Sequence, residues 1–368
     1  MTDNDYLRQA VALATRAWGK TAPNPLVGCV LVRKGEVVAE GWHRGPGTPH
    51  AEADALQKAG AQAQGATAYV TLEPCNHHGQ TPPCSEALIK AGVAEVVYAV
   101  ADPNPVAAGG AERLAAAGVK VRKVIYPQAE ELVRPWIHSL TSSRPYVYAK
   151  LAMSLDGYTA TRTGQSKWIT GPEARAKGHS LRQQTDAILV GVGTVLADDP
   201  RLDPRPEGRE GAPSLKVVLD THLRTPLDAK LLSSPGPVLM AVGPNTDAYK
   251  QAAFEERGAT VLPLPLVGGR PSLPILLRHL KTIPCQLVMV EGGGSLLGSA
   301  FDERLVDEVW AFMAPLIMGG GQPAINGIGP AHVQEALRLE NISTESLGQD
   351  LFLRGTIAQG VTACSQVS

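Results

Sequence analysis

Residues 66–92 read ATAYVTLEPCNHHGQTPPCSEALIKAG, which predicts a strand, a loop with two cysteines and a helix in succession. The apolar, β-branched run Ala66–Leu72 is typical of a buried strand. The segment CSEALIKAG, which starts at Cys84, is typical of a helix that ends at a glycine. Upstream, HAEADALQKA predicts another helix that begins near His50. His50, Cys75 and Cys84 therefore each lie at a predicted helix start or in the turn that leads to one.

The rest of the first half also alternates between strands and helices. We expect a helix from Asp3 or Asn4 to about Trp18, and two more at Ala111–Ala117 and Pro127–Leu140. The other predicted strands are Gly28–Arg33, Val37–Trp42, Glu95–Val100 and Val119–Val124. This alternation predicts an α/β fold with a mostly parallel sheet between layers of helices.

A second α/β series follows a short polar segment that ends in proline, Thr141–Pro145, which we interpret as a linker. We therefore expect two domains, 1–143 and 144–368, as the length of 368 residues favours. The predicted strands of the second domain are Tyr146–Ala152, Ala187–Val190, Leu215–Asp220, Pro237–Val242, Gln286–Glu291, Val306–Ala314 and Leu351–Ile357. Its predicted helices are Pro172–Gln184, Asp247–Arg257, Ser272–Leu280 and Ser295–Phe301.

The composition indicates an enzyme or binding protein for a small molecule. The formal net charge is −1 and no block of Lys and Arg occurs, so we expect no nucleic-acid partner. No run approaches the roughly 20 apolar residues that span a bilayer, so we expect no membrane partner. The first residues are polar and acidic, unlike a signal peptide, and the five cysteines are scattered. We therefore expect a cytoplasmic protein. We also expect a homo-oligomer, either a dimer or a tetramer.

The histidine and the two cysteines of the first domain match the donor set of a catalytic zinc. Such a zinc takes three N or S ligands and keeps one position open, and His50, Cys75 and Cys84 supply that set. Glu52, two residues after the histidine, is then placed to take a proton from bound water and pass it to a departing amine. The pattern H-x-E…P-C-x-x-C is typical of zinc deaminases, although eight residues rather than two separate the cysteines here. The alternative is a capping histidine beside two structural thiols.

The second domain contains glycine-rich turns. VGVGTVLADDPRLDPR spans residues 190–205, and VEGGGSLLGS spans residues 290–299. The second segment predicts a strand, bare backbone N–H groups and a helix start, which suit the pyrophosphate of a dinucleotide. Neither segment satisfies G-x-G-x-x-G, because Leu196 and Leu297 occupy the third glycine position. A plain strand-to-helix turn is the alternative.

The segments NPLVG (residues 24–28), HAE and EPCNHHGQTPPC (residues 73–84) resemble the deaminase domain of the bifunctional riboflavin-biosynthesis deaminase/reductase. The longer cysteine spacing belongs to that family. The resemblance implies a cytidine-deaminase-like α/β/α sandwich, zinc on His50, Cys75 and Cys84, and substrate contacts from Asn24, His43 and His77. The family commonly has a basic residue before Thr81, where this chain has Gln80, so no phosphate-binding residue is assigned there.

The glycine-rich segments, together with MSLDGYTATRTGQSKWIT (residues 153–170), are similar to the reductase of the same family. The resemblance implies a dihydrofolate-reductase-like α/β domain that binds NADPH. Arg224 is a candidate for the 2′-phosphate of that cofactor. The implied substrate contacts are Ser166, Arg182, Leu202, Arg205 and Glu291. The implied cofactor contacts are Ala152, Trp168, Thr194, Asp198, Gly292, Gly293, Gly294, Ser295, Leu296 and Leu297.

The expected function follows from both resemblances. The first domain would remove the 2-amino group of 2,5-diamino-6-(5-phosphoribosylamino)pyrimidin-4-one, a pyrimidine ribotide, and the second would reduce its ribosyl chain to ribityl. One rival is a tRNA or nucleoside deaminase with an unrelated appended domain. The other is a structural zinc module fused to a nucleotide-sensing domain, in which Cys29 would be the fourth ligand.

Overall fold

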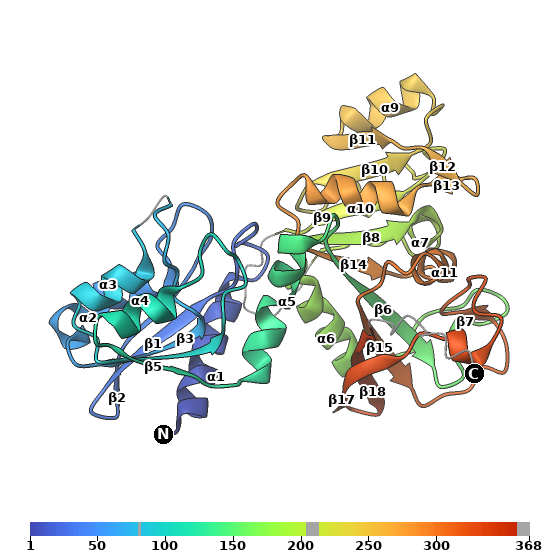
Figure 1. The fold of residues 1–368 in the computed structure, drawn as a ribbon. Coiled ribbons are helices and arrows are strands. Elements are labelled where there is room, and N and C mark those ends of the chain that lie inside the picture. Colours follow the sequence, from blue (N-terminus) through green and yellow to red (C-terminus); the bar gives the residue numbers. More distant parts are fainter. Residues whose placement is uncertain (80–81, 204–212, 359–368) are drawn as a thin grey trace, which may run out of the picture. The chain divides into compact units, whose positions relative to one another are not determined.

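The computed structural model describes residues 1–79, 82–203 and 213–358. The chain divides into two compact units, Met1–Ser143 and Arg144–Ser368, and each is described by itself. They are called the N-terminal unit and the C-terminal unit (Figure 1).

The sheet of the N-terminal unit has the order β2-β1-β3-β4-β5. Its strands are β1 Gly28–Arg33, β2 Glu36–Trp42, β3 Thr67–Leu72, β4 Glu95–Val100 and β5 Lys120–Lys123. Strands β3, β4 and β5 are parallel, but β1 is antiparallel to both of its neighbours. Because β2 and β3 are both antiparallel to β1, strands β2, β3, β4 and β5 all run in one direction, as expected of a mostly parallel sheet, and β1 is the exception. The tight turn Lys34–Gly35, with both φ angles positive, makes β1 and β2 a hairpin, and β1 lies between the parallel pair β2 and β3.

Helices cover both faces of this sheet, so the unit is the expected α/β/α sandwich (Figure 1). The core on one face includes side chains of α1 and α5, and the core on the other includes those of α2, α3 and α4. Thr2, rather than Asp3 or Asn4, caps α1. The helices are α1 Asp3–Ala14, α2 Ala51–Ala59, α3 Cys84–Lys90, α4 Gly110–Ala116 and α5 Pro127–Thr141, with short 3₁₀ turns η1 Thr15–Ala17 and η2 Gly60–Ala63.

The main sheet of the C-terminal unit has the order β11-β10-β9-β8-β14-β6-β15-β18-β17. All pairs from β11 to β15 are parallel, whereas β18 is antiparallel to β15 and β17. Its strands are β6 Tyr146–Ser154, β8 Ala187–Gly191, β9 Leu215–Leu219, β10 Val238–Val242, β11 Ala259–Pro263, β14 Leu287–Glu291, β15 Glu308–Ala314, β17 Leu339–Leu347 and β18 Asp350–Ile357. Two small ladders pair β12 Leu266–Val267 with β13 Arg270–Pro271, and β7 Tyr158–Ala160 with β16 Gln322–Pro323.

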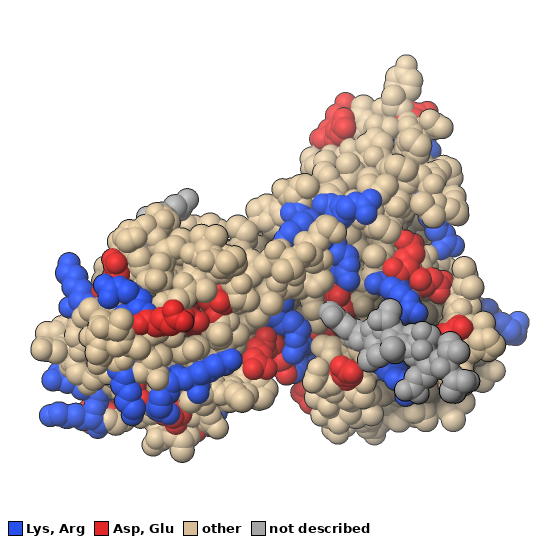
Figure 2. Space-filling view, in the orientation of Figure 1, with Lys and Arg blue, Asp and Glu red and all other residues tan. Residues whose placement is uncertain are grey.

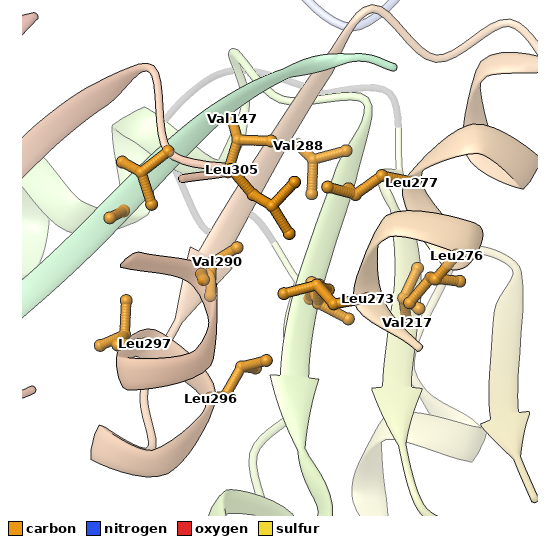
Figure 3. Packing of buried hydrophobic residues seen from close by; sticks show 14 of the residues in the cluster. Val147, Val217, Leu273, Leu276, Leu277, Val288, Val290, Leu296, Leu297 and Leu305 are labelled. Carbon is orange, nitrogen blue, oxygen red and sulfur yellow. The ribbon is translucent and has the colours of Figure 1, made fainter. Parts of the chain in front are cut away.

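Helices α10 and α11 pack their leucines on one face of this sheet. Figure 3 shows Leu273, Leu276 and Leu277 of α10 beside Val217 and Val288 of the strands. Side chains of α6, α7 and α9 belong to the core of the other face. The helices are α6 Pro172–Arg182, α7 Val192–Asp198, α8 Lys230–Ser233, α9 Ala248–Glu255, α10 Leu273–Lys281 and α11 Gly294–Asp302, with the 3₁₀ turn η3 Val333–Glu335.

Several elements of the C-terminal unit lack a sequence signal. Strand β17 reads LENISTESL and is exposed along most of its length, so no apolar alternation marks it. Helix α7 contains Gly193 within the glycine-rich turn, which hides its helical pattern. None of the helices in the described ranges is long and apolar enough to cross a bilayer.

Candidate functional site

The N-terminal unit brings His50, Cys75 and Cys84 together. Their ligand atoms all lie within 4.8 Å of one another. His50 Nδ1 lies 3.5 Å from Cys75 Sγ and 3.4 Å from Cys84 Sγ. His50 is the N-cap of α2, Cys84 is the first residue of α3, and Cys75 lies in the loop after β3. Three segments that are distant in sequence thus each contribute one potential ligand atom to the same group.

Two glycines permit this convergence. A Cβ on Gly41 of β2 would lie 2.1 Å from the carbonyl oxygen of Ala51, so glycine allows α2 to pack closely on the strand. A Cβ on Gly110 would lie 1.7 Å from the carbonyl oxygen of Pro74, so glycine lets the first turn of α4 touch the cysteine loop. Glu73 holds the same loop, because its carboxylate accepts hydrogen bonds from the backbone N–H groups of Asp102 and Ala111.

The donor set fits a zinc ion with one open position. Among the described residues, no fourth His, Cys, Asp or Glu joins the group. One imidazole nitrogen and two sulfurs are ligands that zinc prefers. Hydrogen bonding from Cys84 and the nearby His50 ring lower the pKa of Cys75, although burial alone would raise it. The lowered pKa favours the thiolate, the form that binds zinc. Cys29, the rival fourth ligand, is a buried residue of β1 outside this group.

Glu52 lies beside the triad in the first turn of α2 and is only 4% exposed. Its carboxyl group interacts with the Cys84 thiol. Burial, together with the nearby Cys75 thiolate, raises the pKa of Glu52 to about 7. A carboxyl group with a pKa near neutrality can both accept and release a proton at pH 7.

Asn24 and His43 form a hydrogen-bonded pair near the triad. Asn24 Nδ2 lies 3.0 Å from His43 Nε2, and His43 Nδ1 lies 3.1 Å from the carbonyl oxygen of Pro49. The His43 and His50 rings meet edge to face, 5.5 Å between centroids. His77 Nδ1 is buried and has no hydrogen-bond partner among the described residues. Gln80 lies outside the described residues.

In the C-terminal unit, Arg182 and Glu291, two of the residues expected to contact the substrate, form an ion pair with each other. Arg182 Nε and Nη2 donate to the two carboxylate oxygens of Glu291, both at 2.8 Å. Lys150 of β6, which sequence reasoning missed, donates to the same carboxylate at 3.2 Å. Burial opposes ionisation of Glu291, but Arg182 and Lys150 hold its pKa well below the ordinary value. A lysine inside the apolar run YVYAKLAMS was the signal that could have identified it.

The other expected substrate contacts are more dispersed. Leu202 is buried and has φ +53°, and the next carbonyl oxygen, that of Asp203, accepts a hydrogen bond from Arg182. Ser166 is half-buried, and Arg205 lies outside the described residues. Trp168, an expected cofactor contact, is 70% exposed, and the Arg175 guanidinium stacks over its ring at 4.5 Å.

The expected cofactor loop lies at the carboxyl ends of β8 and β14, which are adjacent parallel strands. Gly292 and Gly293 have φ +77° and +73°, and a Cβ on either would lie 3.3 Å from the Thr194 side chain. The loop therefore offers bare backbone at the start of α11, as an anionic group requires. Leu296 and Leu297 point into the core, whereas Ser295 and Asp198 are exposed and Ala152 is half-buried.

A cleft of about 290 Å³ lies beside this loop. It is lined by the turns after β8 and β9, by the β12–β13 ladder and by α11. A crevice at the carboxyl ends of parallel strands is where open α/β sheets bind nucleotides. The residues of this region therefore fit a dinucleotide cofactor.

Comparison with protein families covers both units. Residues 1–100 match the model described as cytidine and deoxycytidylate deaminase zinc-binding region, and residues 145–353 match the RibD C-terminal domain. The riboflavin biosynthesis protein RibD of Actinobacillus pleuropneumoniae is 43% identical over 96% of this chain and 95% of its own length. RibD of Aquifex aeolicus is 41% identical over 95% of this chain and 97% of its own. The chain belongs to the RibD family.

Solved structures agree with this membership. RibD of Acinetobacter baumannii superposes with a TM-score of 0.83 at 38% identity, covering 97% of this chain and 99% of that one. A Thermotoga maritima protein described as diaminohydroxyphosphoribosylaminopyrimidine deaminase/5-amino-6-(5-phosphoribosylamino)uracil reductase gives 0.82 at 30% identity, covering 96% and 98%. RibD proteins are bifunctional enzymes of riboflavin biosynthesis, and both the deaminase and the reductase domain are present here. Zinc and NADPH are the cofactors of RibD.

Proposed function

We propose that residues 1–143 deaminate 2,5-diamino-6-(5-phosphoribosylamino)pyrimidin-4-one and that residues 144–368 reduce the product to 5-amino-6-(5-phosphoribitylamino)uracil. The observation that carries this proposal is the His50, Cys75 and Cys84 group with buried Glu52 beside it, in a chain related to RibD over nearly its whole length. Similarity to the Thermotoga maritima protein supports the choice of substrate.

In the deaminase, His50, Cys75 and Cys84 would hold zinc, which acidifies water and so supplies a nucleophile at neutral pH. Glu52 accepts one proton of the attacking water and gives it to the ring nitrogen; it then takes the second proton, from the hydroxyl added to the ring carbon, and gives it to the departing amine. Its burial and its pKa of about 7 suit it to both transfers. Water and substrate become ammonia and the uracil product, so no other reactant is needed.

Asn24 would bind an edge of the pyrimidine. His43 Nδ1–H donates to the Pro49 carbonyl, which leaves Nε2 as an acceptor for the Asn24 amide N–H. The Asn24 carbonyl oxygen then remains available to accept a hydrogen bond from the substrate. His77, whose buried Nδ1 has no hydrogen-bond partner in the part of the chain that the structure describes, supplies a further polar contact.

In the reductase, NADPH would supply the hydride that converts the ribosyl C1′ into the ribityl carbon. Glu291, held by Arg182 and Lys150, presents a fixed carboxylate that can accept hydrogen bonds from sugar hydroxyls. Arg205 and the Nη1 group of Arg182 are the proposed contacts for the substrate phosphate, and Ser166 and Leu202 the remaining substrate contacts. Ala152, Trp168, Thr194, Asp198 and the loop Gly292, Gly293, Gly294, Ser295, Leu296 and Leu297 are the proposed cofactor contacts.

Glu52→Gln tests the assignment of the two activities. The amide keeps the side chain's shape but cannot carry the proton, so ammonia release should fall by about 10²- to 10⁴-fold. Zinc content and NADPH oxidation on the deaminated substrate should not change. Ammonia release is measured on the pyrimidine ribotide, and NADPH oxidation is measured separately on the deaminated substrate.

Two outcomes would contradict the proposal. Equal loss of reduction in Glu52→Gln would show that the two sites are not separate. Loss of zinc in Cys29→Ser would support the rival structural module with a fourth ligand, whereas the proposed open site should retain its zinc in that variant. Activity on free nucleoside or RNA, with none on the pyrimidine ribotide, would favour the other rival.

The proposal also covers the localisation, the oligomeric state and the binding partner of the protein. We propose a cytoplasmic homo-oligomer that acts on a small molecule. On the face shown in Figure 2, Lys and Arg side chains are interspersed with Asp and Glu rather than gathered into one basic surface. Analytical ultracentrifugation of the full chain measures the oligomeric state. A monomer at micromolar concentration would contradict the proposed homo-oligomer.

A further inference from the structure

The cleft of the C-terminal unit contains two arginines that form no ion pair with any described residue. Arg224 lies in the turn after β9, and Arg270 is the first residue of β13. Both side chains line the same cleft, and both residues are exposed. Glu303 is the only acidic side chain among the described residues of the lining. The lining is therefore net positive and lacks an internal partner for its cations.

The turn that carries Arg224 is held by a buried carboxylate. Asp220 is fully buried, and one of its oxygens accepts hydrogen bonds from the Thr225 backbone N–H at 2.7 Å and the Thr225 hydroxyl at 2.8 Å. The Leu223 backbone N–H donates to the Asp220 carbonyl oxygen at 3.2 Å. These bonds close the turn on either side of Arg224, so its backbone position is set before any ligand arrives.

Arg270 lines the same cleft beside α11. Its Nη1 lies 3.4 Å from the Ser295 carbonyl oxygen and 3.4 Å from the Ser299 hydroxyl, so the guanidinium is held beside the first turns of α11. These contacts are long and use only Nη1, and within the described ranges the other N–H groups of Arg270 have no hydrogen-bond partner. The hydroxyl of Thr221 adds another possible donor to the lining.

The chemistry of this arrangement matches a phosphate monoester. Guanidinium groups bind phosphate oxygens by paired, charge-assisted hydrogen bonds. The cleft borders the Gly292–Ser295 loop, the proposed site of the cofactor pyrophosphate, and Ser295 lines both. NADPH differs from NADH only by a phosphate on the adenosine ribose. A site in which two arginines bind this phosphate would distinguish the two cofactors.

We propose that Arg224 and Arg270 together bind the 2′-phosphate of the cofactor and so make the reductase prefer NADPH to NADH. This inference rests on the proposed function in one respect, since it takes the cleft to receive the adenosine half of a nicotinamide cofactor. It assigns the preference to two residues from separate elements, the turn after β9 and the β12–β13 ladder.

Calorimetric titration of the full-length protein tests the proposal without any turnover. The ligands are NADPH, NADH, adenosine 2′,5′-bisphosphate and AMP. Arg224→Ala and Arg270→Ala should each weaken binding of the two 2′-phosphorylated ligands by about 10- to 100-fold, as loss of a charge-assisted hydrogen bond implies. Binding of NADH and AMP should change by less than about twofold.

Two further variants separate this effect from damage to the fold. Arg257→Ala removes an exposed arginine of the same unit that does not line the cleft, and it should bind all four ligands as the unmodified protein does. Glu303→Gln removes the acidic side chain of the lining and should tighten binding of the 2′-phosphorylated ligands a few-fold, which misfolding could not produce.

The outcomes distinguish this proposal from the assignment of the reductase. If the unmodified protein binds none of the four nucleotides, the reductase assignment fails and this inference fails with it. If NADPH binds normally but neither arginine variant weakens it, only this inference is overturned. Equal weakening of NADPH and NADH would also overturn it, because the arginines would then act on a part that both cofactors share.

Discussion

Single side chains of the deaminase site take their chemical roles from their neighbours. Burial lowers the pKa of His43, which favours the neutral ring. The neutral ring donates through Nδ1 to Pro49 and accepts through Nε2 from Asn24. His43 thus orients the Asn24 amide, and we interpret it as a positioning residue as well as a substrate contact. Glu52, two residues from His50, owes its raised pKa chiefly to burial, which disfavours the charged carboxylate.

His43→Phe keeps a ring of similar size but removes the acceptor for Asn24. Without that bond the amide can turn over, so kcat/KM for ammonia release should fall by about 5- to 10-fold, most of it in KM. Zinc content should be unchanged. Steady-state kinetics and metal analysis measure the two effects. His78→Phe, at an exposed histidine of the cysteine loop, is the matched control and should leave kcat/KM near its original value.

Close backbone contacts hold the elements that carry His50, Cys75 and Cys84 together. Gly110, at the first residue of α4, lets that helix touch Pro74 directly before Cys75. Gly110→Ala should push the cysteine loop away and weaken zinc binding by about tenfold or more, which competition with a fluorescent chelator measures. Gly178→Ala, at a helical position of α6 with no atom near the added Cβ, is the control. Unchanged zinc affinity in Gly110→Ala would show that the contact does not position Cys75.

The starts of β8 and β14 are joined by a carboxyl group whose ionisation depends on pH. Asp186 accepts hydrogen bonds from the backbone N–H groups of Gln286 and Leu287, at 2.9 and 3.0 Å. Burial raises the pKa of Asp186 from 3.8 to about 6. Because the folded state binds the proton more tightly than the unfolded state, the contribution to stability is present below pH 3.8 and is lost as pH rises through 6.

Asp186→Asn should remove this pH dependence, because the amide oxygen can still accept both bonds and carries no charge. The free energy of unfolding of the variant, relative to the unmodified protein, should rise by up to about 3 kcal/mol between pH 4 and pH 7. Urea unfolding followed by hydrogen exchange in β8 and β14 measures it. A relative stability that falls or stays level over that range would contradict the prediction.

The whole molecule contains two units, each with its own hydrophobic cores and its own candidate site. The zinc group belongs to the N-terminal unit, whereas the Arg182, Glu291 and Lys150 cluster and the glycine-rich loop belong to the C-terminal unit. Two sites built from separate sets of elements should fail separately when one is altered.

Glu291→Gln tests this from the reductase side. The change leaves Arg182 and Lys150 without their carboxylate, so kcat/KM for NADPH oxidation should fall by about 100-fold or more while ammonia release is retained. Both products are measured on the same sample. Glu345→Gln, which breaks the exposed pair with Lys177 in the same unit, should leave both activities intact. Loss of ammonia release in Glu291→Gln would mean that the units do not act separately.

The amino-acid sequence was sufficient for features whose signal is local. The strand–loop–helix segments around His50, Cys75 and Cys84 predicted a metal group, and the structure brings those ligand atoms within 4.8 Å. Strands such as Glu95–Val100 were predicted with the bounds that the structure has, because a buried strand needs a continuous apolar run. The α/β class of each half was predicted from the alternation of strands and helices, and membership of the RibD family from the resemblance of its motifs to that family.

Tertiary structure alone decided the features that join distant residues. No sequence pattern shows that β1 lies between β2 and β3, since strand order depends on how helices cover the finished sheet. Lys150 and Glu291 meet because β6 and β14 are neighbouring parallel strands, although 141 positions separate them along the chain. Arg224, in the turn after β9, and Arg270, in the β12–β13 ladder, line one cleft although they belong to separate elements. Charges far apart in sequence acquire a shared role only when packing of the core sets the distance between them.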